Sequence, residues 1–293
     1  MSAPGNPQPE TDTFARSCAH WSEAGRRGME DFYALASVDY RHLAEARDWK
    51  AWFEQQQSRV GSRHLRLLDV ACGSGKFPAA LLRHSAVPDA AIQPVDYALL
   101  DPARFSIDEA RAALAPPFVP GAEYEATLQD LRCPDRHYDI VWATHALYAV
   151  PATEIDAAMT RFLAAMGGTG FIAHAREDAH YLHFYRLFLD AFYGGEGTPY
   201  TSAEQLIETL DALGADFSVT DIDYHNGVPL GRDSVIEGYL QRCAFDDSIG
   251  LDAMLAHPEL GAYLRGCQHD GAWRFRQKVA LISIEAAPMA LAP

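Results

Sequence analysis

The residues whose types and spacing most clearly indicate a chemical function lie in one short turn. Leu65 to Ala71 is an apolar run of strand length that carries Asp69, and Gly73 and Gly75 follow it directly. Glycine has no Cβ, so it adopts positive φ easily and lets a ligand approach the main chain. A helical pattern starts just afterwards, and the free N–H groups of its first turn would point into the same space. This arrangement predicts a cofactor-binding turn between a strand and a helix.

The amino-acid sequence of the turn excludes two common classes of cofactor-binding motif. A phosphate-binding P-loop needs G-x-x-x-x-G-K-[ST], but Val70 occupies the first glycine position and Phe77 follows Lys76. A dinucleotide-binding turn needs G-x-G-x-x-G, and the third glycine position holds Pro78. Proline suits the first turn of a helix but cannot provide the close helix–strand packing of that glycine. The pattern that remains is Asp-x-x-x-Gly-x-Gly.

The segment Asp69–Gly75, Asp-Val-Ala-Cys-Gly-Ser-Gly, resembles motif I of the class I S-adenosylmethionine (SAM) methyltransferases. The resemblance extends over roughly residues 60–286 and implies SAM as the cofactor and S-adenosylhomocysteine as its product. In that family the motif carboxylate orients the turn and the amino-acid part of SAM, and the glycines pack against the cofactor. The cofactor-binding residues that it implies are Asp69, Ala71, Cys72, Gly73, Gly75, Asp101, Pro102, Ser106, Asp130, Leu131 and Thr144.

Two further acids follow predicted strands. Tyr97–Ala103 predicts a second strand that carries Asp101, 26 residues after the second glycine, near the spacing expected for a carboxylate that binds the ribose hydroxyls. A turn aspartate before Pro102 is the alternative interpretation. Tyr124–Asp130 predicts a third strand, and the resemblance places Asp130 near the adenine. A solvated loop aspartate is the alternative there.

A narrower resemblance concerns the substrate side. Residues 142–286 are similar to the histamine N-methyltransferase type. This resemblance places His145 and Tyr148, just after the predicted fourth strand, in the catalytic pocket and Gln277 against the substrate. His145 stands where that family usually has a glutamine, so the identity of the amine stays open.

The resemblance also implies an acid in an N-terminal helix that holds the cationic amine, for which the candidates are Glu30, Asp31, Asp39 and Glu45. Ring faces attract positive charge, so aromatic side chains are expected to hold the sulfonium or the amine, although core packing is the alternative for any single ring. These rings are Phe14, Tyr33, Tyr40, Tyr148, Tyr181, Phe192, Tyr193 and Tyr200. The predicted substrate-binding set is Tyr33, Tyr40, His145, Tyr148, His174, Tyr181 and Gln277.

The implied reaction is direct in-line transfer of a methyl group to a small molecule, most readily to a nitrogen of an amine, an imidazole or an amino-acid-like substrate. A nitrogen must lose its proton before it attacks, and His145 is the candidate base. A pocket-shaping role for His145 is the alternative. Methylation of oxygen or carbon in a biosynthetic pathway, and SAM binding without methyl transfer, are the rival functions.

Composition narrows the partners. A net charge of −16 argues against nucleic acid, which requires a basic surface. The sequence contains no apolar run of about 18 residues that could span a membrane, and residues 1–12 predict a disordered polar tail without a signal peptide. Five cysteines without a C-x-x-C pair indicate reduced thiols in a cytoplasm. We expect a cytoplasmic enzyme with a small-molecule substrate; the sequence does not indicate its oligomeric state.

One pattern could suggest a metal. His180 and His183 stand three residues apart on a predicted helix. A polar, aromatic cap is the alternative interpretation. A magnesium-dependent methyltransferase of the catechol type would place a carboxylate after the fourth strand, where this chain has Thr144 and His145. We therefore expect no metal site.

The predicted fold is α/β: a Rossmann-like, seven-stranded, mostly parallel sheet with the last strand antiparallel, helices on both faces and an added helical cap. Apolar spacing predicts helices over Phe14–Tyr33 and Tyr40–Glu54, and strands at Phe217–Tyr224 and Val279–Glu285 with a turn at Gly250 between them. The expected organisation is a tail (1–12), an N-terminal helical cap (13–60) and a SAM-binding domain (61–293) with helical insertions at about 176–212 and 233–270.

Overall fold

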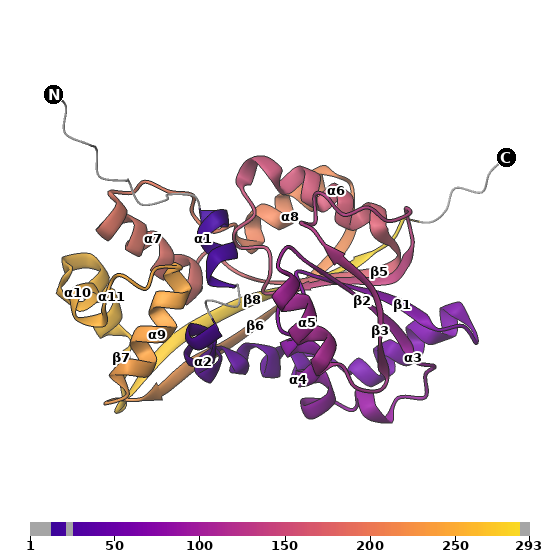
Figure 1. The fold of residues 1–293 in the computed structure, drawn as a ribbon, viewed down its shortest axis with the longest axis horizontal. Coiled ribbons are helices and arrows are strands. Elements are labelled where there is room, and N and C mark those ends of the chain that lie inside the picture. Colours follow the sequence, from indigo (N-terminus) through magenta and orange to yellow (C-terminus); the bar gives the residue numbers. More distant parts are fainter. Residues whose placement is uncertain (1–12, 22–25, 288–293) are drawn as a thin grey trace.

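The computed structural model describes residues 13–21 and 26–287, so the predicted tail at residues 1–12 lies outside the described part (Figure 1). The strands are β1 (Leu65–Val70), β2 (Val95–Asp101), β3 (Phe118–Glu125), β4 (Tyr138–Thr144), β5 (Met166–Ala175), β6 (Asp216–Pro229), β7 (Gln268–His269) and β8 (Ala272–Glu285). The helices are α1 (Thr13–His20), α2 (Arg26–Glu45), α3 (Trp49–Val60), α4 (Lys76–His84), α5 (Arg104–Ala113), α6 (Ile155–Ala165), α7 (His180–Tyr193), α8 (Ala203–Ala212), α9 (Asp233–Ala244), α10 (Leu251–Ala256) and α11 (Pro258–Gly266).

One sheet organises the described chain. Its strands lie in the order β3-β2-β1-β4-β5-β8-β6, and the short β7 pairs with β8. Strands β1 to β5 pair in parallel, whereas β8 runs antiparallel to both β5 and β6. The predicted Rossmann-like sheet with an antiparallel last strand is confirmed.

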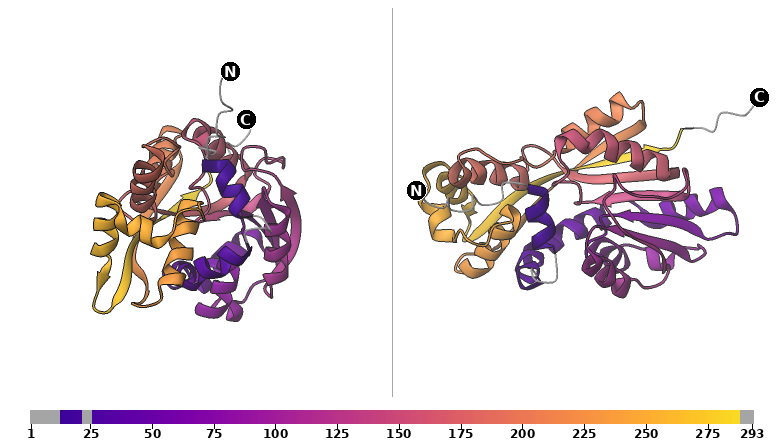
Figure 2. Two further views of the ribbon diagram at one scale, coloured as in Figure 1. Left: turned by 60° about the vertical axis from the view of Figure 1, so that its left-hand side comes forward. Right: turned by 45° about the horizontal axis from the view of Figure 1, so that its top comes forward.

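Helices cover both faces of the sheet (Figures 1 and 2). The end of α2 together with α3, α4 and α5 packs on one face, where Phe53 and Phe77 are buried. Helices α6 and α8 cover the other face, where Phe162 and Leu206 are buried against Val141. The central strands are therefore buried on both sides, which explains why β1 is a continuous apolar run instead of an alternating one.

Strands β6 and β8 extend well beyond the predicted strands, to 14 residues each. Their pairing runs unbroken from Asp216 opposite Glu285 to Pro229 opposite Ala272. The far half of this two-stranded ribbon leaves the sheet and enters the cap (Figures 1 and 2), where Phe275 packs among α7, α9, α10 and α11. Backbone hydrogen bonds of the ribbon thus set the position of the cap relative to the sheet.

Three predicted boundaries are wrong, each for a local reason. The third strand is β3 and not Tyr124–Asp130; it is an edge strand with mostly exposed side chains, so it carries no apolar signal. The predicted helix Phe14–Tyr33 is divided between α1 and α2. The predicted helix Tyr40–Glu54 is interrupted because Asp48 caps α3, accepting the Ala51 N–H at 3.0 Å. The predicted turn at Gly250 is confirmed, since this glycine precedes α10.

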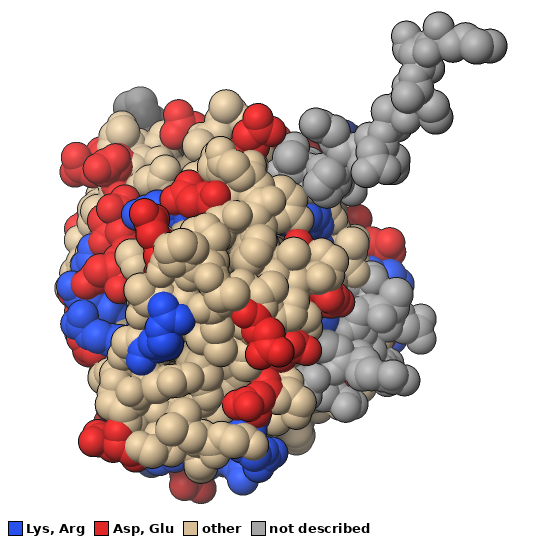
Figure 3. All heavy atoms as spheres, turned by 90° about the vertical axis from the view of Figure 1, so that its left-hand side faces the viewer, with Lys and Arg blue, Asp and Glu red and all other residues tan. Residues whose placement is uncertain are grey.

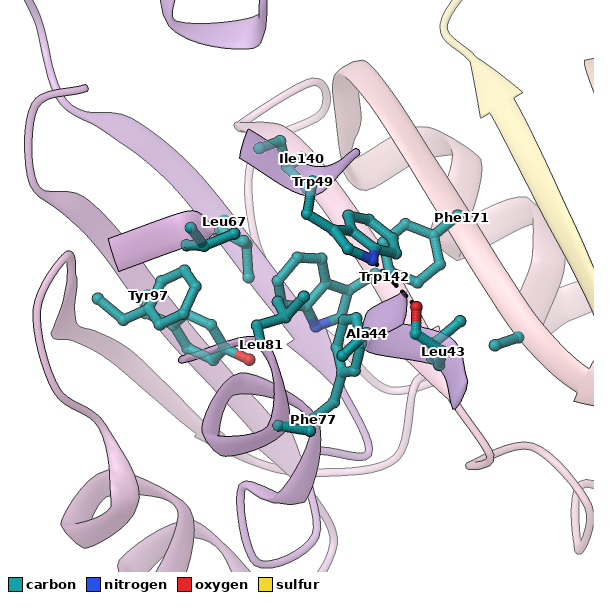
Figure 4. Close-up of a cluster of buried hydrophobic side chains, with 14 of the residues drawn as sticks. Leu43, Ala44, Trp49, Leu67, Phe77, Leu81, Tyr97, Ile140, Trp142 and Phe171 are labelled. Atoms are coloured by element: carbon teal, nitrogen blue, oxygen red, sulfur yellow. Dashed lines mark hydrogen bonds between the residues drawn. The ribbon is translucent and has the colours of Figure 1, made fainter. Parts of the chain in front are cut away.

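Trp49 anchors α3 on the sheet (Figure 4). Its ring lies 5.6 Å from that of Phe77 and 5.1 Å from that of Phe171, and its indole N–H donates to the Leu43 carbonyl oxygen at 3.0 Å. Trp142 from β4 packs between the same two phenylalanines. The last turns of α2 and all of α3 therefore belong to the core of the sheet. The predicted division at residue 60 stays a prediction.

Replacing Trp49 with alanine should therefore destabilise the fold. The side chain is 1% exposed and its loss leaves a cavity between helix and sheet, so we expect the free energy of unfolding to fall by about 3–5 kcal/mol. Denaturant unfolding measures this. Trp52→Ala, at a half-buried position on the same helix, is the control and should cost clearly less; equal losses would show that Trp49 has no anchoring role.

Candidate active site

The carboxyl ends of β1, β2 and β4 open into one cavity, which α1, α2 and cap residues also line. In open α/β sheets ligands bind where the strand order reverses, here between β1 and β4. The empty space between its lining residues, including the open solvent at its mouth, is about 1480 Å³. The predicted site residues that line it are Tyr33, Tyr40, Asp69, Ala71, Cys72, Gly73, Asp101, Pro102, Ser106, Thr144, His145, Tyr148 and Tyr181.

The two glycines of the turn have different roles. Gly73 has φ +52° and no atom within 4 Å of the position that a Cβ would occupy, so its backbone faces open space. Gly75 has φ +69°, and its Cβ would lie 3.1 Å from Ala110 of α5. Gly75 is therefore needed for the packing of α4 against α5, and Gly73 is the glycine that a cofactor can approach.

Asp101 ties the turns after β1 and β2 together. Its Oδ2 accepts the Gly73 N–H at 3.1 Å, and its Oδ1 accepts the Ala103 N–H at 2.9 Å. Burial raises the pKa of Asp101, and these two backbone donors partly offset the rise. Each carboxylate oxygen keeps a further lone pair, so the group can still accept ribose hydroxyls.

Asp69 is a buried acid without a cation. It is 2% exposed, and its Oδ2 accepts the Tyr97 hydroxyl at 2.7 Å. Burial raises the pKa of Asp69 to about 7, against the lowering effect of hydrogen bonds from Tyr97 and Trp142. A buried carboxylate is stabilised by a positive partner, and SAM carries an ammonium group on its amino-acid part. The residues present thus fit this cofactor.

The predicted adenine side is only partly assembled. Leu128 and Gln129 line the cavity, whereas Asp130 is exposed in the loop and accepts the Thr127 hydroxyl at 3.0 Å. Leu131 is buried in the core of the α6 face. Asp130 therefore lies outside the described lining, and β3 ends earlier than predicted, at Glu125.

His145 has φ +53°, a conformation that non-glycine residues rarely adopt and that often marks a functional site. Burial lowers the pKa of His145 to about 3, so the ring is neutral. Its Nδ1 lies 2.9 Å from the Tyr148 hydroxyl, and burial keeps that hydroxyl protonated by raising its pKa. The direction of this hydrogen bond depends on the tautomer of His145; in the tautomer in which Nδ1 accepts the hydroxyl proton, the ring proton sits on Nε2. Among the described residues, Nε2 has no hydrogen-bond partner.

His174 packs against Tyr148 and is not among the residues that line the cavity. Its ring lies 4.1 Å from that of Tyr148, and its Nε2 donates to the Thr201 carbonyl oxygen at 2.9 Å. Gln277 is fully buried and reaches the Tyr239 hydroxyl at 3.4 Å. Neither His174 nor Gln277 is part of the lining, so direct substrate contact by either stays a prediction.

Of the four candidate acids, Asp39 is the one that the structure brings to the cavity. It is 3% exposed; its Oδ2 accepts the Tyr181 hydroxyl at 2.5 Å, and its Oδ1 has no partner. Burial raises the pKa of Asp39 to about 6, although Tyr181, Tyr224 and Asn226 all lower it. Glu45 is instead exposed and paired with Arg41, and the side chains of the other two candidates lie outside the described residues.

Several lining residues were not predicted. Lys76, at the first position of α4, was considered in the sequence only as evidence against a P-loop. Trp21, Phe32 and Arg242 come from the N-terminal helices and the cap, and no local pattern marks them. Cation–π contact joins two of them, since the Arg242 guanidinium lies 5.1 Å from the Trp21 ring centroid.

Comparison with known proteins identifies the family. Residues 33–218, more than half of the chain, match the family of methyltransferase domains. The chain therefore belongs to this family, and the glycine turn with its two acids makes it a SAM-dependent methyltransferase. A search among curated proteins finds no match.

Solved structures show the same fold at low identity. Magnesium protoporphyrin IX methyltransferase of Synechocystis PCC 6803 with bound S-adenosylhomocysteine is 12% identical, with a TM-score of 0.52 over 92% of this chain and 99% of that one. A Bacillus halodurans C-125 protein, provisionally named a methyltransferase, is 13% identical, with a TM-score of 0.51 over 80% and 99%. A Thermotoga maritima protein, provisionally named a histamine N-methyltransferase, is 12% identical, with a TM-score of 0.47 over 92% and 99%; this likeness carries no argument about the acceptor.

The described part of the chain adds three findings. Figure 3 shows the cap end, where Lys and Arg side chains are interspersed with Asp and Glu instead of forming one basic surface. Among residues 13–21 and 26–287, no helix combines the length and apolar character needed to cross a membrane. Within the same ranges, no group of three or more His, Cys, Asp or Glu side chains could hold a metal ion.

Asp69→Asn should make the ligand-free protein more stable at pH 8. The variant keeps an acceptor for Tyr97 and removes the buried charge. The pKa of Asp69 is about 7 when folded and 3.8 ordinarily, so the charge destabilises the fold fully above pH 7 and progressively less as the pH falls toward 4. We expect the free energy of unfolding of the variant to exceed that of the parent by about 1–4 kcal/mol at pH 8, and this difference should shrink as the pH falls toward 4. Denaturant unfolding across this pH range measures it.

The same variant should bind SAM at least ~10-fold more weakly in calorimetry, because the cofactor ammonium loses its charged partner. Asp252→Asn, at an exposed position on α10, is the control and should leave both properties unchanged. If the parent protein were as stable as the Asp69 variant at pH 8, the buried charge of Asp69 would not destabilise the fold, and the prediction would be wrong.

Proposed function

We propose that this methyltransferase acts on the nitrogen of a small cationic amine. The observation that carries the proposal is the carboxylate of Asp39, buried in the cavity with one oxygen unpaired. A carboxylate in such a place gains most from a positively charged partner that brings its own hydrogen-bond donors. A protonated amine supplies both. No Lys or Arg whose side chain the structure describes forms an ion pair with Asp39 or contributes to its pKa shift.

Aromatic rings around Asp39 support the same class of ligand. Tyr40, Tyr148 and Tyr181 line the cavity with it. Their ring faces attract a cation and also a methylated ammonium product. A phenol or a carbon acid would use the rings but would place no positive charge opposite Asp39, so the O- and C-methylation alternatives leave this carboxylate unpaired.

Asp39 and His145 have different roles toward the acceptor. The cofactor, when bound, supplies an electrophilic methyl group on its sulfonium. Asp39, with a pKa of about 6, can hold the ammonium form and receive its proton near neutral pH. His145, with a pKa lowered to about 3, is too weak a base for that task, and its Nε2–H is instead a donor for a lone pair of the substrate. Residues of α1 and α2 line the cavity as well and would displace water from a bound acceptor.

An assay with a panel of small amines, imidazoles and phenols tests the proposal, with mass spectrometry of the product to identify the methylated atom. Asp39→Asn should raise the KM for the amine about 100-fold or more, because a buried ion pair is lost. SAM binding should stay unchanged. Glu45→Gln, an exposed acid on the same helix, is the matched control. Methylation of phenols only, or equal KM values in the Asp39 variant and the parent, would overturn the proposal.

His145→Gln separates a donor from a base. The amide keeps an N–H donor but cannot take up a proton, so we expect kcat to fall less than ~10-fold, whereas loss of a general base costs about 10²–10⁴. Steady-state kinetics with the amine identified above measures this. A loss of two orders of magnitude in kcat would restore His145 as the base.

A further inference from the structure

The turn that holds Asp69 also presents a cation to the cavity, namely Lys76 of α4. Its Nζ lies 4.4 Å from the centroid of the Tyr33 ring. Among the described residues, no carboxylate forms an ion pair with Lys76. Contact with a ring face leaves the three N–H donors of the ammonium group available to an anion.

Tyr33 offers a second donor at the same place. The Ser74 hydroxyl donates to the Tyr33 hydroxyl at 3.3 Å, so the proton of Tyr33 remains available. The other cation of the described lining, Arg242, is already committed to the neighbouring helix: it donates to the His20 carbonyl oxygen and covers the Trp21 ring. Lys76 and Tyr33 therefore form the part of the cavity best able to receive a carboxylate.

Asp69, in the strand that precedes the turn, lines the same cavity and supplies the opposite charge; it is buried and forms no ion pair with a described Lys or Arg side chain. A ligand group that carries both an ammonium and a carboxylate matches this pair of sites. The amino-acid part of SAM is such a group, and so is an amino-acid-like acceptor.

We infer that Lys76, assisted by the Tyr33 hydroxyl, binds the carboxylate of the amino-acid part of SAM, while Asp69 pairs with its ammonium. This assignment rests on the cofactor and is independent of the acceptor proposed above. It also gives helix α2, which carries both Tyr33 and Asp39, a direct contact with the bound cofactor.

Calorimetry with two ligands tests the inference: S-adenosylhomocysteine and its decarboxylated analogue, which keeps the ammonium, the thioether and the nucleoside. The parent protein should prefer the complete ligand by ~10-fold or more, the size of a charged hydrogen bond. Lys76→Met should abolish that preference and leave the affinity for the decarboxylated analogue unchanged. Lys76→Arg should keep the preference, and Tyr33→Phe should reduce it in part.

Lys50→Met, on α3 outside the described lining, is the control and should behave as the parent protein. An equal loss of affinity for both ligands in Lys76→Met would overturn the inference, because it would indicate a structural role. If Lys76→Met kept the parent's preference for the complete ligand, the inference would also be overturned. The carboxylate of the cofactor would then bind elsewhere, and Lys76 could instead bind a carboxylate of the acceptor.

A measurement on the unmodified chain covers the case in which the variants fail to fold. The sequence contains three lysines, Lys50, Lys76 and Lys278, so reductive methylation can be followed at each by peptide mass spectrometry. S-adenosylhomocysteine should protect Lys76 several-fold more than the decarboxylated analogue does, with the other two lysines unaffected. Equal protection by both ligands, or none by either, would contradict the assignment.

Discussion

Two buried carboxylates, Asp69 and Asp39, have no Lys or Arg partner among the described side chains, and the rest of the site depends on how they are stabilised. Each accepts one tyrosine hydroxyl, and each has its pKa raised toward neutrality by burial. A protein tolerates such groups when ligands complete them, because burying an uncompensated charge lowers stability. One acid stands at the end of a strand where the cofactor binds. The other stands on a helix over the space left for the acceptor.

The fold meets this constraint by joining two layers at one cavity. The sheet brings the carboxyl ends of β1, β2 and β4 together, and Asp101 ties the first two turns through backbone N–H groups. The ribbon of β6 and β8 carries the cap outward and places Asn226 and Tyr224 near Asp39. Helix α2 packs against both α4 and α9 and so connects the two layers. The acceptor side is thus built on backbone pairing and does not depend on mobile loops alone.

The cofactor side was largely predictable from the sequence, and the acceptor side was not. Gly73, Gly75 and Asp101 could be selected from the sequence because each stands at or just after the end of an apolar strand. The strand before Asp130 was placed too late because β3 is an exposed edge strand without an apolar pattern, and a cofactor contact by Asp130 stays a prediction. His145 was identified by position, but its weak basicity follows from burial among side chains of other elements.

The sequence by itself determined the class of cofactor and the class of fold, since a short glycine turn encodes its own backbone conformation and apolar runs encode buried strands. Only the tertiary structure decided which candidate acid lines the cavity and which cation stands beside the turn. Asp39 meets Tyr181 across 142 residues, and Lys76 meets the ring of Tyr33 from another helix. Such contacts depend on how the ribbon and α2 position the cap relative to the sheet. No local sequence pattern predicts that arrangement.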